Sequence, residues 1–502
     1  MIEFIQHPNS KDNLAFHNGV ELVLITGPTI NQLIALAKSH PKEWIGWSKS
    51  RLMSIDWLEL KRVANKPYKM VSKGAAPCFL TDYIDYIEDT PFINFKENYW
   101  YPTWIMSTDL GLIHSSVLVK VGKFNSSNNF EYDLNLISRK IQPQGVFCYS
   151  KLTKKSICRD QNSRLFLFVA QSRKARWLLF LLLCFIIFEK KFPLFASAKA
   201  MLLNSSHFNP EVEFSYGQNQ EPFNDQLEYD VIIPTIGRPN YLKNVLRDLD
   251  SQQLKPKKVI IIEQNTVREA VSELNFLEEE LWGFEIIHSF THKAGACRAR
   301  NEAISKTTAP WILLFDDDNR FSSDLMQKVA RSLNEIGCKV LNFAYLQEGE
   351  SENQKGYLQW AFFGSGCSIV HRDAIKKCRF DQALEYGYGE DADYGMQLRN
   401  NGFDVIYAPE IQVQHLKAPV GGFRQPVKFD WSDDELKPQP SPHVMYFRRK
   451  NYTSNQLHGY KLKLFFQNYL SSATKNPWRY YKQFNKRWQA SVYYSERLTS
   501  SI

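Results

Sequence analysis

Residues 310–320 read P-W-I-L-L-F-D-D-D-N-R, a short apolar run that leads directly into three consecutive aspartates. An unbroken apolar run bounded by polar residues is typical of a strand that is buried on both faces, as in a parallel sheet. Ligands of open α/β sheets bind at the carboxyl ends of the strands, which is where Asp316, Asp317 and Asp318 would lie. The stretch therefore predicts a central strand that ends in a binding site.

The three aspartates need an explanation, because adjacent carboxylates repel one another unless a cation joins them. Mn²⁺ or Mg²⁺ prefers oxygen ligands, and phosphate oxygens of a bound ligand would complete its coordination. A solvated acidic turn has the same sequence, so the aspartates alone leave both interpretations open. The chain on either side favours the metal site.

Length and composition describe a multidomain globular protein. The chain has 502 residues, 44% of them hydrophobic and 23% charged, which is too long for one core and predicts two or three domains. Eight cysteines include no C-x-x-C pair, which indicates reduced thiols in a cytosolic protein and no structural zinc. The N-terminal residues lack the basic start and apolar core of a signal peptide. We therefore expect a cytoplasmic protein.

Strand and helix patterns alternate around the central stretch. Apolar runs begin at Tyr229, Lys257 and Phe284, and a helical spacing of apolar residues follows the first of them. The segment H-K-A-G-A-C-R-A-R-N, from His292, reads as a loop that enters a helix. This alternation predicts an α/β fold with a mainly parallel sheet.

Several polar residues fall where such a sheet would bind a nucleotide. Thr235 and Glu263 end adjacent strands, where they could bind a base and a ribose or serve only as turn residues. Lys293, Arg298 and Arg300 bring positive charge to a helix N-terminus, which suits phosphate, although a solvated helix face would look the same.

Residues further along the chain offer a base and another metal ligand. Glu390, Asp391 and Asp393 open a helix, where the helix dipole favours carboxylates with or without a catalytic role. The glycines of Gly364-Ser365-Gly366 allow the backbone to approach a ligand closely. His415 ends a strand and becomes a credible ligand because a metal is already expected nearby.

Residues 228–425 resemble a family 2 glycosyltransferase of the GT-A fold. The resemblance is carried by an ordered set of motifs: V-I-I-P-T from Val231, A-R-N from Ala299, the three aspartates, F-D at Phe380, G-E-D-A-D from Gly389, L-R-x-x-G from Leu398, and a histidine before Gly-Gly. An ordered set over this length is far more specific than any one motif.

The resemblance implies a role for each matching residue. Asp316 and Asp318 would bind the metal and the donor diphosphate, His415 would be a further ligand, and Asp391 would be the general base. The expected donor-binding residues are Thr235, Arg238, Glu263, Arg300, Asp316 and Asp317, and the expected acceptor-binding residues are Gly366, Glu390 and Trp360. The family often has Asp-Asp after the second strand, where this chain has Glu263-Gln264, and that departure puts the identity of the base in doubt.

The implied reaction is a single inverting transfer of a sugar from a nucleoside-diphosphate sugar, with a UDP-sugar expected, to a glycan or lipid-linked acceptor in bacterial surface polysaccharide synthesis. A divalent ion and arginine would neutralise the leaving diphosphate, and one carboxylate would deprotonate the acceptor hydroxyl. The processive Q-x-x-R-W pattern is absent, so we expect addition of one or a few sugars. There are two alternatives: a nucleotidyltransferase, and a non-catalytic protein that binds a nucleotide sugar or a glycan. A nucleotidyltransferase would need a Gly-rich loop with a lysine near the first strand, and the sequence has none there.

Residues 1–160 repeat the order of elements seen in residues 228–430. Glu131, Asp133 and Arg139 fall on Asp391, Asp393 and Arg399 at one constant offset, whereas Ser48-Lys49-Ser50 stands where the aspartates would be. We interpret this segment as a degenerate copy that has lost metal-dependent chemistry and serves in packing or acceptor binding. Two unrelated α/β segments that share a pattern are the alternative.

The remaining segments raise the question of a membrane. Trp177–Phe188 is wholly apolar but too short to span a bilayer, so it fits either a core helix or one in the membrane interface. It belongs to a segment, 161–227, that ends in a polar linker. The tail, 431–502, is rich in basic and aromatic residues, which suits an anionic membrane surface or a solvated face. No nucleic-acid motif accompanies it, so we expect no nucleic-acid partner.

Overall fold

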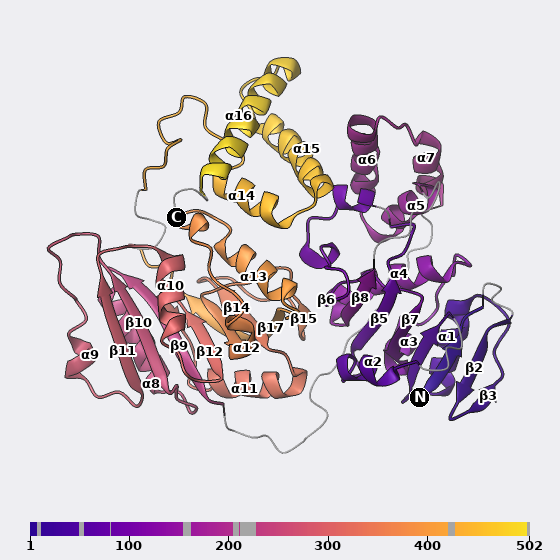
Figure 1. The fold of residues 1–502 in the computed structure, drawn as a ribbon, viewed down its shortest axis with the longest axis horizontal. Coiled ribbons are helices and arrows are strands. Elements are labelled where there is room, and N and C mark those ends of the chain that lie inside the picture. The colour runs from indigo at the N-terminus through magenta and orange to yellow at the C-terminus, as the bar shows by residue number, and fades with distance from the viewer. Residues whose placement is uncertain are drawn as a thin grey trace. The chain divides into compact units, whose positions relative to one another are not determined.

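The computed structural model describes residues 1–7, 12–49, 55–80, 82–153, 162–203, 210, 227–419 and 427–498. The chain divides into two compact units, Met1–Phe214 with Tyr452–Asn468 and Ser215–Asn451 with Tyr469–Ile502. Each unit has one large sheet with flanking helices (Figure 1), so the predicted α/β class is confirmed. The division groups residues 162–203 and 210 of segment 161–227 with the first unit and shares the tail between both units.

The second unit is built on a nine-stranded sheet of order β11-β10-β9-β12-β16-β14-β17-β13, with β15 paired to β17. Strands β11, β10, β9 and β12 are parallel, whereas β16 runs antiparallel to both β12 and β14. The strands are β9 (Tyr229–Ile236), β10 (Lys258–Gln264), β11 (Glu285–Thr291), β12 (Trp311–Phe315), β13 (Asn319–Arg320), β14 (Val340–Leu346), β15 (Leu358–Gln359), β16 (Cys367–His371) and β17 (Ile406–His415). Residues 312–315 of β12 are all buried, as predicted for a central strand.

Helices cover this sheet with the faces that the sequence spacing predicts. Leu242, Val245, Leu246 and Leu249 are the buried residues of α8, at helical spacing. One core cluster joins α10, α12 and α13 to strand residues such as Ile232 and Ile312, which places these three helices on one face. The helices are α8 (Pro239–Asp250), α9 (Phe276–Glu279), α10 (Ala296–Ser305), α11 (Leu325–Ile336), α12 (Arg372–Ile375), α13 (Glu390–Asn400), α14 (Pro442–Asn451) and α16 (Pro477–Arg497), with a 3₁₀ turn, η6 (Gln382–Leu384).

The first unit has an eight-stranded sheet of order β3-β2-β1-β4-β7-β5-β8-β6. Its strands are β1 (Ile2–Ile5), β2 (Leu14–His17), β3 (Val20–Leu22), β4 (Trp44–Ser48), β5 (Lys69–Ala75), β6 (Trp100–Pro102), β7 (Leu110–His114) and β8 (Phe147–Thr153). Its helices are α1 (Thr29–Ser39), α2 (Trp57–Val63), α3 (Ser115–Val121), α4 (Phe130–Ile141), α5 (Asn162–Ser172), α6 (Ala175–Cys184) and α7 (Leu194–Leu202), with 3₁₀ turns η2 (Asp82–Tyr86), η3 (Pro91–Ile93) and η4 (Gln142–Gln144).

The two sheets share a pattern of strand pairing. β1 pairs with β4 in parallel as β9 does with β12, and β4 pairs with β7 antiparallel as β12 does with β16. β5 lies between β7 and β8 as β14 lies between β16 and β17, with the same directions. Trp44 and His114 pack edge to face across neighbouring strands, and Trp311 and His371 do the same at the equivalent place.

The apolar run at Trp177–Phe188 forms most of α6 and the π-helical turn η5 (Phe185–Glu189). Leu178, Leu181, Cys184 and Phe185 are buried, so one side of this run belongs to the core of the first unit. Among the described helices, none combines the length and apolar character needed to cross a bilayer. Helix α15 (Ser454–Ser471) begins in the first unit and ends in the second.

The cysteines agree only in part with the predicted reduced state. Six of them are free thiols: Cys148, Cys184, Cys297, Cys338, Cys367 and Cys378. Cys78 is disulfide-bonded, so the prediction is wrong at that position. Pairing depends on how close two cysteines lie in the fold, which the absence of C-x-x-C spacing does not report.

Candidate active site

The carboxyl ends of β9, β10 and β12 meet in the second unit. Thr235 of β9 lies directly beside Glu263 of β10 in the sheet register, and Asp316 follows the last residue of β12. Because parallel strands end at the same edge of a sheet, side chains that are far apart in sequence converge here. This edge contains most of the predicted site residues.

Asp317 is held in a buried polar network. Its two carboxylate oxygens accept hydrogen bonds from Thr235 Oγ1, at 2.6 Å, and from Arg238, at 2.7 Å. Burial raises the pKa of Asp317 to about 6, although Arg238 and Thr235 oppose that rise. The predicted donor-binding residues Thr235, Arg238 and Asp317 are therefore in mutual contact, and Arg238 also reaches Asp318 at 3.3 Å.

Asp318 and His415 lie side by side. Asp318 Oδ2 accepts a hydrogen bond from the Ala418 amide at 2.9 Å, and His415 Nε2 lies 3.5 Å from Asp318 Oδ1. Oδ1 is a buried atom with no hydrogen bond among the described residues. Burial raises the pKa of Asp318, but His415 and the Ala418 amide lower it more, so the net shift is downward. The pair thus presents an anionic oxygen and an imidazole nitrogen at one point.

Asp316 points to a different set of partners. Arg300 donates to Asp316 Oδ1 at 2.9 Å, and the Tyr345 hydroxyl lies 3.3 Å from Oδ2. A Cβ at Gly366 would lie 2.4 Å from Asp316 Oδ2, so a side chain there would displace the carboxylate. Tyr345 also stacks on the His415 ring, with centroids 4.4 Å apart, and so connects Asp316 to the Asp318–His415 pair.

Asp391 lies at the start of α13 and is hydrogen-bonded to the loop that contains Gly366. Its Oδ2 accepts a hydrogen bond from the Ser365 amide at 3.1 Å, and its buried Oδ1 has no hydrogen bond among the described residues. Burial raises the pKa of Asp391, although Arg300 opposes this, and burial together with Asp391 raises the pKa of Glu390 to about 7. Asp391 is therefore a desolvated carboxyl group with one oxygen free to accept a proton.

Glu263 is fixed within its own network. It accepts hydrogen bonds from Ser272 Oγ at 2.6 Å, from the Glu273 amide at 2.9 Å and from His288 Nε2 at 2.9 Å. Burial raises its pKa, but these hydrogen bonds, led by that of His288, lower it overall. Its neighbour Gln264 accepts from the Gly295 amide at 2.7 Å. Glu263 is thus a charged, positioned acceptor suited to a ribose hydroxyl rather than to proton transfer.

The N-terminus of α10, where a phosphate is expected from the sequence, holds a carboxylate of the chain itself. Glu385 accepts hydrogen bonds from the amides of Cys297 and Arg298 at 2.9 and 3.0 Å. Arg298 pairs with Glu302, one turn further along the same helix. Of the cations expected at this helix, Arg300 is the one that contacts the aspartates at the strand ends.

The contacts of Trp360 are with residues other than these carboxylates. Its ring stacks on Tyr407 with centroids 4.4 Å apart and packs with Ala344 and Leu358. Its carbonyl oxygen accepts a hydrogen bond from Arg399 of α13. These contacts describe a side chain that supports β15, β17 and α13.

The structure adds residues to the site that the motifs do not mark. Tyr345 connects Asp316 with His415, Ser365 fixes Asp391 through its amide, and Glu385 occupies the start of α10. Ser365 was within the glycine-rich loop, so its position could have been inferred. Tyr345 and Glu385 carry no motif, and only tertiary contacts reveal them.

No group of three or more His, Cys, Asp or Glu side chains within the described parts of the chain has the arrangement of a metal site. Asp318 and His415 are adjacent, whereas Asp316 faces Arg300 and Tyr345. The lone Oδ1 of Asp318 is a buried anionic atom without a hydrogen bond, and its pairing with an imidazole suits Mn²⁺. The donor set therefore fits a divalent cation whose remaining ligands come from elsewhere.

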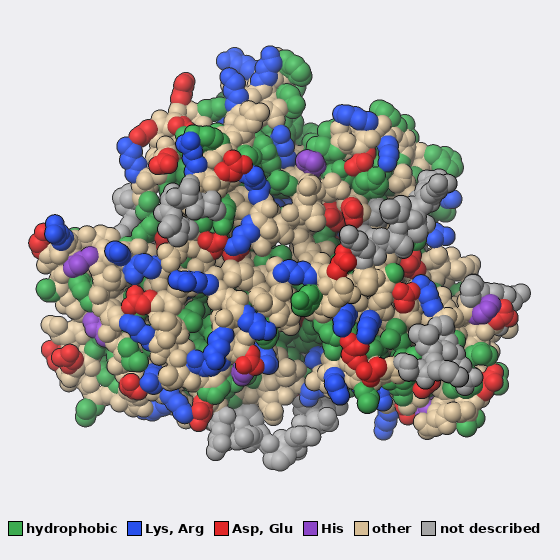
Figure 2. All heavy atoms as spheres, viewed as in Figure 1, with side chains coloured by type: hydrophobic (Ala, Val, Ile, Leu, Met, Phe, Trp, Pro, Cys, Tyr) green, Lys and Arg blue, Asp and Glu red, His purple; other side chains and the backbone are tan. Residues whose placement is uncertain are grey.

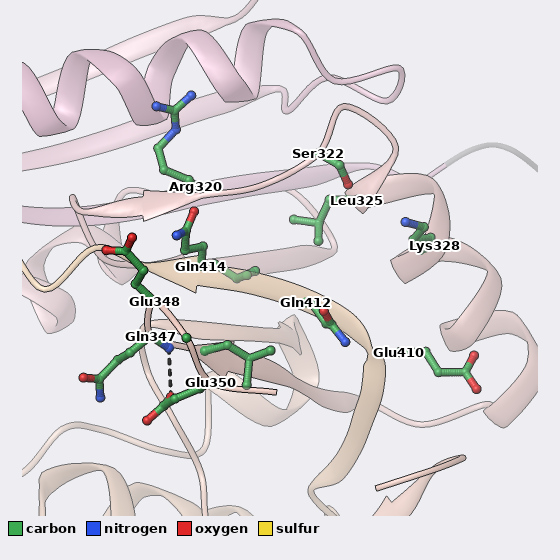
Figure 3. A pocket seen from close by; sticks show the side chains of 13 residues that line it. Arg320, Ser322, Leu325, Lys328, Gln347, Glu348, Glu350, Glu410, Gln412 and Gln414 are labelled. Atoms are coloured by element: carbon green, nitrogen blue, oxygen red, sulfur yellow. Dashed lines mark hydrogen bonds between the residues drawn. The ribbon is translucent and has the colours of Figure 1, made fainter. Parts of the chain in front are cut away.

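A cavity of about 470 Å³ lies on another face of the second unit (Figure 3). It is lined by polar side chains that include Arg320, Gln347, Gln412 and Gln414. Arg320 directly follows Asn319, and Gln414 directly precedes His415. Because Asn319 and His415 are paired and successive side chains of a strand alternate between its faces, Arg320 and Gln414 point to the opposite face. The cavity is thus separate from the Asp318–His415 pair.

Residues 230–384 match the model of the family described as glycosyl transferase family 2. The resemblance inferred from the motifs is therefore confirmed over residues 230–384, which lie in the second unit. The match begins in β9 and includes the three aspartates and Arg300, whereas Asp391 and His415 follow it.

A curated relative is the GalNAc(5)-diNAcBac-PP-undecaprenol beta-1,3-glucosyltransferase of Campylobacter jejuni subsp. jejuni serotype O:2. The two sequences are 20% identical over 183 residues, which are 34% of this chain and 58% of the relative. The matched segment thus spans a little over half of the relative's length.

Solved structures similar to this chain include that of S. aureus TarS 1-349 in complex with UDP-GlcNAc. That structure has a TM-score of 0.38 and 16% sequence identity, covering 55% of this chain and 83% of the other. The complex of the same protein with UDP has a TM-score of 0.36 and 15% identity, covering 50% and 74%.

Proposed function

We propose that the second unit is an inverting, divalent-cation-dependent glycosyltransferase that moves a sugar from a nucleoside-diphosphate sugar to an acceptor hydroxyl. One observation carries the proposal. The Gly364-Ser365-Gly366 loop joins two kinds of carboxylate, because the Ser365 amide binds Asp391 while Gly366 lies against Asp316. A candidate base and the candidate diphosphate site thus flank one short stretch of backbone, as a displacement at a sugar carbon requires.

Asp318 and His415, with Asp316 beside them, are the residues that would hold the cation. When bound, a divalent ion neutralises charge that develops on a departing diphosphate. Asp318 is suited to this position because its lowered pKa keeps it anionic and its Oδ1, which lies 3.5 Å from His415 Nε2, accepts no hydrogen bond among the described residues. Tyr345 positions both His415 and Asp316 through stacking and a hydroxyl contact.

Two arginines of the chain bring positive charge to the proposed cation and diphosphate site. Arg300 is buried, contacts Asp316, and has its pKa raised by Asp316, Asp391 and Glu390 despite the opposing effect of burial, so it remains protonated. Arg238 is similarly fixed by Asp317 and Asp318. Both guanidinium groups are therefore ordered before a ligand binds, which favours recognition of phosphate.

Asp391 is the proposed general base. The base must face the acceptor hydroxyl and take its proton, and Asp391 Oδ1 is the oxygen that has no hydrogen bond in the described structure. A raised pKa brings a carboxylate closer to the range in which it is an effective base. Glu263 is an unsuitable alternative, since its oxygens already accept three hydrogen bonds and its pKa is lowered.

We further propose a UDP-sugar as donor, a glycan or lipid-linked acceptor, and a place in bacterial surface polysaccharide synthesis at the cytoplasmic side of the membrane. The donor class is supported by the family 2 match and by the Thr235–Glu263 ends of β9 and β10, which can bind a nucleoside. The printed name of the Campylobacter relative describes a glucosyltransferase whose acceptor carries a PP-undecaprenol lipid. A similar lipid-linked acceptor is the simplest proposal for this chain.

The first unit is proposed to be a degenerate copy without a cation site. It shares the strand pairing of the second unit, yet Lys49, just after β4, stands where Asp316 follows β12. Lys49 Nζ lies 2.6 Å from Asp109, an aspartate just before β7, where the second unit has Gly366 just before β16. The metal-binding carboxylate and the glycine beside it are thus replaced by an ion pair. Ser50, the third residue of the predicted replacement, lies outside the described residues.

The test is release of nucleoside diphosphate from a panel of nucleotide sugars, with Mn²⁺ and with candidate acceptors. We expect release from one donor in the wild type and its loss in Asp318→Ala. The matched control is Asp324→Ala, which removes an aspartate just before α11 that pairs with Lys328. Donor binding without turnover with any acceptor would favour a nucleotide-sugar binder, and release of pyrophosphate would indicate a nucleotidyltransferase.

A further inference from the structure

Helix α7 buries small residues and exposes large apolar ones, which is the reverse of a typical surface helix. Its buried residues are the small ones, Ala196, Ser197 and Ala200, and the helix contacts α5 and α6. Its large apolar residues face outward, with Phe195 80% and Leu202 83% exposed. A helix that faces water normally turns large apolar residues inward. The exposed face of α7 is therefore made for an apolar environment.

The exposed apolar residues continue beyond α7 into its flanks. We call this set the α6–α7 apolar patch; its members are Leu179, Phe192, Leu194, Phe195, Met201, Leu202 and Leu203, all exposed. Hydrophobic atoms gather over the region of these two helices, at the upper right of Figure 2. A contiguous exposed apolar surface of this kind is uncommon on a soluble protein and marks an interaction site.

Basic residues surround the patch. Lys174, Arg176, Lys190, Lys191 and Lys199 are exposed beside it, and residues 190–203 contain no acidic residue. The preceding acid, Glu189, accepts a hydrogen bond from the Tyr86 hydroxyl at 2.6 Å. Apolar side chains between lysines and arginines are complementary to an anionic lipid surface, where the apolar groups enter the interface and the cations contact headgroups.

The patch stands on a fixed base. The other side of the α6 segment is buried through Leu178, Leu181, Cys184 and Phe185. Helix α5 beneath it is buried through Leu165, Phe166, Phe168 and Val169. The apolar run at Trp177–Phe188 thus serves mainly as the support, and apart from Leu179 the residues of the patch lie further along the chain. The sequence alone did not separate these two roles.

We propose that the α6–α7 apolar patch docks the chain on an anionic lipid bilayer, with α7 lying in the plane of the interface. The proposal depends on the proposed function only for its purpose, since a lipid-linked acceptor would lie at such a surface. The charge of the flanks selects lipid over a protein partner, because lysines and arginines border the patch while its own stretch contains no acid.

The test is co-sedimentation of the full chain with vesicles of phosphatidylcholine alone and with added phosphatidylglycerol. We expect binding that requires the anionic lipid, and at least about tenfold weaker binding for the double variant Phe195→Ser with Leu202→Ser. The matched control is Val271→Ser with Leu281→Ser, which removes two other exposed apolar side chains, 77% and 100% exposed, and is expected to bind like the wild type. Circular dichroism checks that each variant is folded.

Other outcomes would overturn the proposal. Failure of the wild type to bind anionic vesicles, or unchanged binding in the Phe195 and Leu202 variant, would do so. Loss of binding only in Lys482→Glu with Lys486→Glu would assign the lipid surface to α16 instead, and concentration-dependent dimerisation that the patch variant abolishes, without vesicle binding, would assign the patch to a second copy. Donor turnover is measured separately without vesicles, so failure of the proposed enzyme activity and failure of membrane docking remain distinguishable.

Discussion

Asp391 and Asp318 each have a buried oxygen that accepts no described hydrogen bond, but burial raises the pKa of Asp391, whereas His415 and the Ala418 amide lower that of Asp318. The aspartates after β12 instead contact arginine, threonine or tyrosine. This separates the residues into one that can take a proton and three that can hold charge. Displacement of a nucleoside diphosphate needs a base that can accept a proton and positively charged groups that are held in place.

The first prediction concerns the base. Asp391→Asn keeps the shape of the side chain and its contact with Ser365 but removes the basic oxygen, so transfer should fall by roughly 10²- to 10⁴-fold. Donor affinity, measured by calorimetry, should stay near that of the wild type. Glu263→Gln is the comparison variant and should weaken donor binding more than turnover. Normal turnover in Asp391→Asn would assign the base to another residue.

The second prediction concerns pH. Burial raises the pKa of Asp391, and burial with the neighbouring Asp391 raises the pKa of Glu390 to about 7. A base acts when deprotonated, so the transfer rate should fall as the pH decreases through the raised pKa of Asp391. In Glu390→Gln a neighbouring negative charge is lost, and the acid limb of the profile should move to lower pH by roughly one unit. An unmoved limb would mean that another group controls it.

What the sequence predicts at the residue scale depends on whether a role is local. The three aspartates, Arg300 and Asp391 lie in motifs, and their convergence follows from the rule that parallel strands end at one edge. Tyr345 lies inside an ordinary strand, and its role comes from tertiary contacts: its ring stacks on His415 and its hydroxyl lies near Asp316. The residues at the start of α10 predict a phosphate site because nothing in that stretch reveals that Glu385, far along the chain, occupies the helix N-terminus.

At the scale of elements, α4 and α5 of the first unit are joined by a buried charge cluster. Glu88 has a side chain only 1% exposed, lies 3.1 Å from Arg139 of α4 and also pairs with Arg173 just after α5. Burial raises the pKa of Glu88, but the two arginines lower it overall, so it is a buried carboxylate ion. Sequence periodicity predicts apolar helix faces, and it gives no sign of such a cluster.

The third prediction tests this cluster. Glu88→Ala leaves two buried guanidinium groups without their shared partner and should destabilise the region by about 3–5 kcal/mol. Glu59→Ala, in the more exposed pair with Lys73, is the control and should cost less than about 1 kcal/mol. Because a chain of two units need not unfold in one step, hydrogen exchange of α4 and α5 amides is the appropriate measurement. Equal exchange in both variants would refute the role of Glu88.

At the scale of the whole molecule, the chain contains two sheets that share the pairing of their central strands and have opposite charge at the equivalent strand end, although β2 pairs with β1 antiparallel where β10 pairs with β9 in parallel. The order of motifs along the sequence was enough to align the two halves, because strand order and helix spacing are properties of local pattern. The replacement of the aspartates by Ser48-Lys49-Ser50 is visible in the sequence, but the sheet register moves it by one residue, so that Lys49 rather than Ser48 takes the place of Asp316. The compensation of Lys49 by Asp109 is not visible in the sequence. That compensation appears only once β4 and β7 are neighbours in the sheet.

The fourth prediction follows from this asymmetry. A lysine paired at 2.6 Å with an aspartate already satisfies the local charge, so a divalent cation would have to displace a fixed ammonium group to bind there. Calorimetric titration of the full chain with Mn²⁺, in the presence of a nucleoside diphosphate, should therefore show one site per chain. Asp318→Ala should abolish that site, and Asp109→Ala, the matched change in the first unit, should leave it intact. Two sites of similar affinity, or loss of binding in Asp109→Ala alone, would mean that the first unit has kept the cation chemistry that its lysine argues against.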